Sequence, residues 1–247
     1  MKKIQKFLLF LVISVCCFAT DGQTATTKTA TAKPSAEAWL TKKGRELLDI
    51  LSIPETKKRY LKLRRIAHEV FSQKEMPRLA MGKYWKELTP EQQETLRTLF
   101  FDYFVVTYGS FNFDFSQISF KVTEKIPSGK DLLLRTKIKI NEKKARDELN
   151  AMKNSLPNKE NSQPVTTNSE DVEAFFALRE TETGYYIRDA KFEGQSVMMF
   201  LRSQLESEYK NVLKSETFLK NMQEKINRQY RAAEDLDKMQ KEKEKSN

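Results

Sequence analysis

Few side chains in this sequence are of the types that carry out chemistry, and they are scattered. The chain has one histidine, His68, and its two cysteines are the adjacent Cys16 and Cys17 near the N-terminus. His68 lies in a segment rich in Lys and Arg with no paired nucleophile, so we interpret it as a surface residue. The sequence contains no glycine-rich phosphate loop and no metal-ligand cluster. We therefore expect no catalytic residue, no metal site and no cofactor.

Acid–base chemistry is the enzymatic alternative. Asp189 or Glu193 could act as an acid or base beside a hydrophobic pocket, as in a small hydrolase or isomerase. Such a site needs a second convergent polar group, and the sequence does not indicate one. We interpret Asp189 and Ser196 as residues that cap or bridge neighbouring backbone. Gly82 and Gly194 are typical of positions that need a tight turn.

The N-terminus has the layout of a secretory signal peptide. Three lysines precede an apolar run from Phe7 to Phe18. This run of about a dozen residues is shorter than the roughly 20 that a transmembrane helix needs. We place the signal peptide at residues 1–19. An uncleaved anchor, or a lipoprotein modified at Cys16 or Cys17, is the alternative.

The composition limits the possible partners. The formal charge is +10, of which the three signal-peptide lysines contribute +3 and the mature chain +7. This excess is spread along the chain without interleaved aromatic residues, which argues against nucleic acid as a partner. It favours anionic headgroups or acidic protein surfaces. Both cysteines lie in the signal peptide, so the mature chain can form no disulfide.

Helical periodicity dominates the chain up to about Tyr108. The polar residues 20–36 are expected to form a flexible leader. Apolar spacing of three and four predicts helices over three segments, which are 37–51, 55–71 and 76–81. Thr89, Pro90 and Gln92 then predict a capped helix start, with Thr89 as N-cap and Gln92 completing a capping box.

Period-two alternation replaces the helical pattern after Tyr108. It predicts two hairpins, one over 118–140 and one over 172–192. Residues 141–171 between them are expected to form a surface insertion. Helix returns from Val197 to Ile226, and the charged tail 227–247 is either a solvated helical extension or disordered. We expect one domain over 37–226.

Two blocks of the sequence resemble the MlaC (toluene-tolerance) family. The first is Met81-Gly82-Lys83-Tyr84-Trp85, followed by the Thr89 helix start and the Phe-rich segment Phe100 to Tyr108. The second is Gly184 to Asp189, followed by Phe192 to Val197 and Leu201 to Leu205. Their order makes the resemblance specific over roughly residues 40–222. Tyr185 departs from it, since the family usually has Trp there, and the insertion is longer than usual.

The resemblance implies an α+β fold, with helices packed on a curved antiparallel sheet that enclose an apolar cavity for a phospholipid. The lipid would be cargo, not a cofactor. The resemblance further implies a periplasmic shuttle between the inner and outer membranes that maintains lipid asymmetry. Its partners would be an inner-membrane ABC transporter complex with an MCE protein and an outer-membrane lipoprotein complex. A periplasmic adaptor or chaperone that binds proteins through an apolar surface is the alternative.

The predicted cavity draws on large apolar residues of the Phe-rich helix, both hairpins and the last helices. They are Phe100, Phe101, Phe104, Val105, Tyr108, Phe120, Val122, Leu134, Ile138, Phe175, Ile187 and Phe200. An ordinary filled core is the alternative interpretation of the same residues. The lipid phosphate should stay near water, and the candidate residues at the mouth are Lys83, Tyr84, Arg188 and Arg202.

Overall fold

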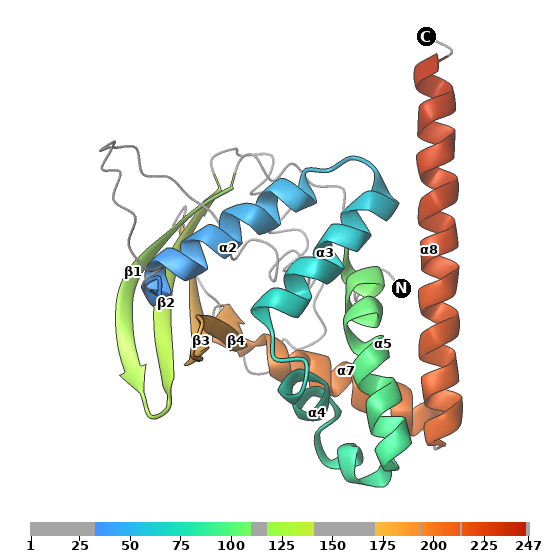
Figure 1. Ribbon diagram of the computed structural model, residues 1–247, viewed down its shortest axis with the longest axis horizontal. Helices are drawn as coiled ribbons and strands as arrows, with labels where there is room; N and C mark the ends of the chain where they lie inside the picture. The colour runs from blue at the N-terminus through green and yellow to red at the C-terminus, as the bar shows by residue number, and fades with distance from the viewer. Residues whose placement is uncertain (1–32, 110–117, 141–170, 193, 213, 246–247) are drawn as a thin grey trace. The chain divides into compact units, whose positions relative to one another are not determined.

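The computed structural model describes residues 33–109, 118–140, 171–192, 194–212 and 214–245. The predicted signal peptide, most of the leader and nearly all of the insertion lie outside these ranges. The chain forms two compact units (Figure 1). The first comprises the chain up to Leu48 together with Phe113–Gly194, and the second comprises Asp49–Asn112 and Gln195–Asn247.

The first unit is built on an antiparallel meander. Its strands are β1 (Ile118–Ser128), β2 (Asp131–Ile140), β3 (Asp171–Glu180) and β4 (Tyr185–Phe192), and the two-residue β5 (Gln195–Ser196) follows at the start of the second unit. The strand order is β1-β2-β3-β4-β5. Register shifts interrupt the β1–β2 and β3–β4 pairs. Such bulges bend strands, and β1 and β2 form a long curved pair in Figure 1. Both predicted hairpins are confirmed.

The two faces of this sheet differ in polarity. Phe120 pairs in register with Ile138, and Ile138 with Val172, and all three side chains are buried. We call the side that carries them the apolar face. Lys121 and Lys137 pair one position along and are exposed, so they mark the polar face. The alternation of the sequence thus places each residue on one face of the pleat.

The helix α2 (Ala36–Leu51) begins in the first unit. The Ser35 hydroxyl accepts a hydrogen bond from the Ala38 N–H at 3.1 Å, which caps the first turn. The Trp39 ring then packs edge-on against the Tyr185 ring of β4, with 5.9 Å between the centroids. The first turns of α2 are therefore held against the start of β4.

Apart from β5, the regular elements of the second unit in its described part are helices. These helices are α3 (Thr56–Val70), α4 (Glu75–Met81), the 3₁₀-helix η1 (Gly82–Glu87), α5 (Pro90–Tyr108), α7 (Val197–Val212) and α8 (Ser215–Lys245). The helix α5 packs against α3 and α8, and α4 packs against α7. The predicted helices up to α5 begin and end within a few residues of these bounds. The predicted helical segment 197–226 is two helices, α7 and α8, and α8 continues to Lys245. Among the described residues, no helix combines the length and apolarity that crossing a membrane requires.

The start of α5 is the predicted capping box. The Thr89 hydroxyl accepts a hydrogen bond from the Gln92 N–H at 3.3 Å, and the Gln92 side-chain oxygen accepts one from the Thr89 N–H at 3.0 Å. Pro90 occupies the first helical position, where an N–H would have no intrahelical partner. Trp85, just before this start, is buried. The sequence around Thr89 therefore sets where α5 begins.

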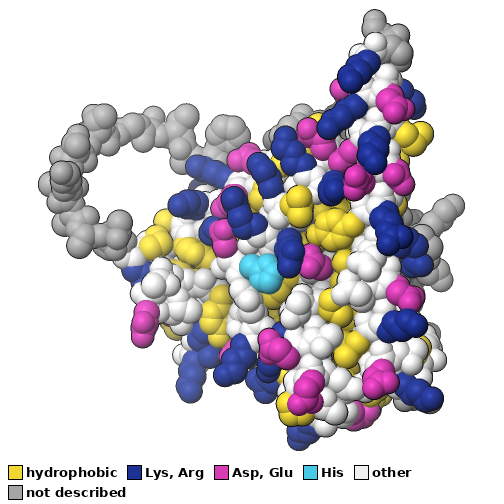
Figure 2. Space-filling model, turned by 45° about the vertical axis from the view of Figure 1, so that its right-hand side comes forward, with side chains coloured by type: hydrophobic (Ala, Val, Ile, Leu, Met, Phe, Trp, Pro, Cys, Tyr) yellow, Lys and Arg dark blue, Asp and Glu magenta, His cyan; other side chains and the backbone are white. Residues whose placement is uncertain are grey.

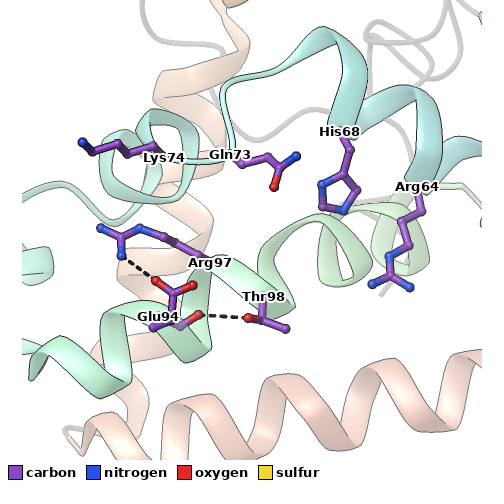
Figure 3. A pocket seen from close by; sticks show the side chains of 7 residues that line it. All are labelled: Arg64, His68, Gln73, Lys74, Glu94, Arg97 and Thr98. Atoms are coloured by element: carbon purple, nitrogen blue, oxygen red, sulfur yellow. Dashed lines mark hydrogen bonds and ion pairs between the residues drawn. The ribbon is translucent and has the colours of Figure 1, made fainter.

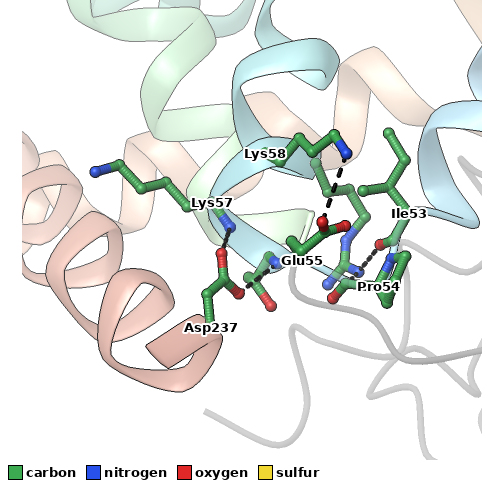
Figure 4. Close-up of polar contacts among 8 residues, drawn as sticks. Ile53, Pro54, Glu55, Lys57, Lys58 and Asp237 are labelled. Carbon is green, nitrogen blue, oxygen red and sulfur yellow. Dashed lines mark hydrogen bonds and ion pairs between the residues drawn. The ribbon is translucent and has the colours of Figure 1, made fainter. Parts of the chain in front are cut away.

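The charged tail is part of α8, which runs without interruption to Lys245. Of the two alternatives for the tail, the described residues show helix. Asp237 accepts hydrogen bonds from the backbone N–H groups of Thr56 at 2.7 Å and Lys57 at 3.0 Å (Figure 4). Tyr230 packs edge-on against Tyr60, with 5.7 Å between the ring centroids. The tail therefore packs against α3 as far as Asp237.

Candidate functional site

Most of the predicted lining residues of the first unit lie on the apolar face. Phe120, Leu134, Ile138 and Ile187 are all buried there. Val122 is half-buried and pairs in register with Thr136 on the same face. The sheet therefore brings these five predicted residues onto one surface.

Thr136 is a polar residue on this face, and it is fully buried. Its hydroxyl donates a hydrogen bond to the Ala174 carbonyl oxygen at 3.0 Å on the neighbouring strand. A buried hydroxyl without a partner would oppose burial against hydrocarbon. Because the bond to β3 satisfies this donor, Thr136 leaves the face apolar in effect.

Phe175, a predicted lining residue, lies on the polar face of the sheet, the face opposite to Phe120. It pairs in register with Arg135, whose guanidinium carbon lies 5.2 Å from the centroid of the Phe175 ring. Its neighbour Phe176 occupies the apolar face, 6.3 Å from Phe120 and 6.2 Å from Phe192 between ring centroids. The reason is register, because a shift of one residue moves a side chain to the opposite face.

The predicted lining residues on α5 mostly pack inside the helical unit. Phe101 is 1% exposed, with its ring 4.7 Å from His68 and 6.4 Å from Phe71 of the neighbouring segment. Phe100 and Val105 are also buried. Phe101 therefore fills the contact between α3 and α5.

Two of the remaining predicted lining residues on helices keep some exposed surface, and the side chain of the third is not among the described residues. Phe104 is half-buried, with its ring 6.4 Å from Phe71, and Phe200 on α7 is also half-buried. Tyr108 ends α5, but its side chain lies outside the described residues. The predicted cavity needs residues of both units, so it stays a prediction.

His68 is more buried than we predicted. Its ring packs on Phe101, and the side chain is half-buried, yet part of it reaches the surface, where it is the cyan patch in Figure 2. An imidazole combines an apolar ring face with polar edge atoms, which suits such a boundary position.

Two of the predicted mouth residues, Lys83 and Tyr84, are neighbours on η1. The Lys83 ammonium is exposed and lies 5.1 Å from the centroid of the Tyr84 ring. The Tyr84 ring in turn lies 4.9 Å from that of Tyr209 on α7. The pKa of Tyr209 is raised, first by burial and then by the hydrogen bond to Glu87 and the negative charge of Glu87. The Tyr209 hydroxyl therefore stays protonated. The Tyr209 hydroxyl donates to Glu87 at 3.0 Å.

Arg202, the third predicted mouth residue, lies against the turn that joins α4 to η1. Its Nε donates a hydrogen bond to the Leu79 carbonyl oxygen at 3.0 Å. Gly82 forms the turn with a φ of 58°, and a Cβ added there would lie 3.1 Å from Cδ of Arg202. This observation confirms the predicted tight turn at Gly82. It also gives Arg202 a structural contact within the helical unit.

Arg188, the fourth predicted mouth residue, belongs to an ion-pair cluster of the first unit. Its guanidinium donates to Asp131 at 3.1 Å, and Arg179 donates to the other carboxylate oxygen of Asp131. Burial alone would raise the pKa of Asp131, but the hydrogen bonds and charges of the two arginines outweigh it and hold that pKa below its usual value. Arg188 thus already has an anionic partner in the protein.

The residues of the enzymatic alternative make local backbone contacts. The Asp189 carboxylate accepts from the Ala190 N–H at 2.9 Å, and the Ser196 hydroxyl accepts from the Met199 N–H at 3.0 Å at the start of α7. Both observations confirm their predicted capping roles. Glu193 lies outside the described residues. Within the described ranges, no group of three or more His, Cys, Asp or Glu side chains could hold a metal ion.

These features define an α+β protein with an apolar sheet face and a buried, Phe-rich helix. Residues 42–150 match the family model described as MlaC protein. Its fold is similar to that of the phospholipid-binding protein from Ralstonia solanacearum, which was solved in complex with a phospholipid. The TM-score is 0.52 at 15% identity, over 80% of this chain and 99% of that chain. No curated protein matches the sequence.

Proposed function

We propose that this chain binds a phospholipid and carries it between the inner and outer membranes. The match of residues 42–150 to the MlaC family model supports the proposal, as does the likeness in fold to a protein whose structure holds a phospholipid. The observation that carries it is the apolar face of β1–β4. This face is lined by large apolar side chains, and its Thr136 hydroxyl is satisfied within the sheet.

The energetics explain why such a face is needed. Exposing an acyl chain to water costs about 0.8 kcal/mol per CH₂ group, which comes to roughly 20 kcal/mol or more for two sixteen-carbon chains. A phospholipid therefore does not cross an aqueous compartment unaided. A carrier must offer a dry surface that replaces the bilayer interior without stranding polar groups. The apolar face has this composition.

The location and partners are part of the proposal. The signal peptide would export the chain, and the family resemblance implies the periplasm as its destination. There it would receive or deliver lipid at an inner-membrane ABC transporter complex with an MCE protein and at an outer-membrane lipoprotein complex. Of the four predicted mouth residues, Lys83 is the most exposed, so it is the best placed to meet a phosphate.

We propose binding rather than catalysis, and the test is whether lipid accompanies the purified protein. The chain would be expressed with its signal peptide in a Gram-negative host and purified without detergent. Native mass spectrometry and thin-layer chromatography of the extract should find about one phospholipid per chain. If the protein purified from such a host contains no bound lipid, the result contradicts the carrier proposal and favours the adaptor or the enzyme alternative.

A further inference from the structure

A polar cleft lies entirely within the helical unit. It is an open cavity of about 490 Å³ between α3, the segment that leads into α4, and the first half of α5. Figure 3 shows Gln73 and His68 on one side of it, and Arg97 and Thr98 on the other. Its volume is within the range of small-molecule sites, but its lining is polar and charged. The cleft therefore suits a polar ligand and not an acyl chain.

Positive charge predominates around the cleft. Arg64, Lys74 and Arg97 line it, against the carboxylate of Glu94. Arg64 is partly neutralised, because its Nε lies 3.2 Å from Asp102. Lys74 is exposed, and the structure gives it no partner among the described residues. Lys74 and Arg97 are thus the cations best placed to meet an anion.

Arg97 is held in place with part of its donor capacity unused. Its guanidinium stacks over the Trp85 ring at 5.1 Å and donates one hydrogen bond to Glu94 at 2.8 Å. Its Nε atom is buried and has no hydrogen-bond partner in the described part of the chain. Buried guanidinium N–H groups are normally paired. Because the Nε atom is enclosed by the protein, an oxyanion in the cleft would bind the outer guanidinium N–H groups of Arg97.

We propose that this cleft binds a phosphate group, on a small polar phosphate ester. A tetrahedral oxyanion has acceptors for a guanidinium and an ammonium at once, as cations on different elements require. The volume leaves room for a glycerol-sized alcohol, and the Gln73 amide and the Thr98 hydroxyl offer neutral hydrogen bonds to it. The ester could be free in solution or form the headgroup of a membrane lipid.

The test uses the mature full-length chain with inorganic phosphate and glycerol 3-phosphate, measured by calorimetric titration at low ionic strength. Lys74→Gln removes an exposed charge, so the fold should persist, and we expect phosphate affinity to fall about tenfold. Arg97→Gln should weaken binding at least as much, and Arg97→Lys less, because it keeps the charge. The matched controls are Lys62→Gln on α3 and Arg231→Gln on α8, both exposed residues that do not line the cleft.

Vesicle sedimentation distinguishes the two sources of phosphate. Binding to phosphatidylglycerol vesicles that is lost in Lys74→Gln but kept in Lys62→Gln assigns the site to lipid headgroups. Binding of glycerol 3-phosphate without vesicle binding assigns it to a soluble ester, and either result supports the cleft. The proposal is overturned if millimolar phosphate and vesicles both fail to bind, or if Lys74→Gln and Lys62→Gln bind equally well. Lys74→Gln should leave copurified phospholipid unchanged, so this site and the carrier function can fail independently.

Discussion

Asp237, close to the C-terminal end of α8, caps the first turn of α3 by accepting a hydrogen bond from the Thr56 N–H at 2.7 Å across 181 positions of sequence (Figure 4). The N-cap residue of α3, Glu55, makes no capping hydrogen bond through its own side chain. The α8 carboxylate takes that place, and its charge also interacts favourably with the N-terminal end of the helix dipole. The charged tail therefore has a structural function.

Asp237→Ala should lower the free energy of unfolding by about 1 kcal/mol, the usual cost of losing an N-cap. Asp237→Asn should cost less, because an amide oxygen can still accept the hydrogen bond. Urea denaturation followed by circular dichroism would measure both. The control is Asp235→Ala, two residues earlier on the same helix and exposed. Equal losses in the Asp237 and Asp235 alanine variants would show that the cap contributes nothing.

Gly82→Ala should destabilise the protein by about 1 to 3 kcal/mol. Gly82 has φ 58° and ψ −129°, a conformation that side chains disfavour, and the new methyl group would also press on Arg202 at 3.1 Å. Gly194→Ala separates the two effects, because Gly194 has a φ of 81° but no atom near its added Cβ. Thermal unfolding should therefore show a greater loss for Gly82→Ala. A larger loss at Gly194 would mean that the contact with Arg202 is unimportant.

The Asp131 cluster should make stability depend on pH in acid. The pKa of Asp131 is lower in the folded protein than its usual value of about 3.9, so its ionised form is favoured by folding. This contribution is complete above the unfolded-state pKa and is lost as the pH falls through the folded-state pKa. The difference in unfolding free energy between wild type and Asp131→Asn should be about 1 kcal/mol at pH 6 and shrink below about pH 4.

Urea titrations at pH 6, 4 and 3 would follow this difference. Asp49→Asn, at an exposed position, controls for the general effect of removing one negative charge. If the difference for Asp131→Asn stayed constant across these pH values, Arg179 and Arg188 would not be favouring its charged form.

Local patterns made much of the fold predictable. The start of α5 depends on Thr89 and Gln92, which are three residues apart and bond to each other. The strands follow from alternation, because apolar residues such as Phe120 and Ile138 are each flanked by polar residues and therefore lie on the buried face. The capping role of Ser196 could also be predicted from the local sequence, because the helix that it caps begins at the next residue.

The contacts that could not be predicted join distant residues or depend on register. The Asp237 cap joins a side chain of α8 to the backbone of α3. The sequence of a charged tail does not show which helix the tail will contact. The adjacent pair Phe175 and Phe176 offers two equally apolar choices, and the pairing with β2 decides between them. The polar cleft likewise combines Lys74 and Arg97 from different elements, and in sequence each resembles an ordinary solvated charge.

The difference between the two sheet faces yields the sharpest test of the lipid site. Val122 and Phe175 are both half-buried in strands of the same sheet, but Val122 lies on the apolar face and Phe175 on the polar face. Val122→Asp would place a charge where acyl chains are proposed to lie, which hydrocarbon does not tolerate. Phe175→Asp introduces the same charge on the polar face, where water can hydrate it, next to Arg135, which already pairs with Glu124 and Glu173.

We expect the Val122→Asp variant to be exported and folded but to copurify with at most about one tenth of the wild-type phospholipid, a loss corresponding to about 1.4 kcal/mol or more of binding free energy. Phe175→Asp should retain a near wild-type amount. Lipid phosphorus per mole of purified protein measures both, and circular dichroism verifies that each variant is folded. Equal lipid content in the two variants would mean that the apolar face of β1–β4 does not contact the cargo, and the site would have to be sought on other elements.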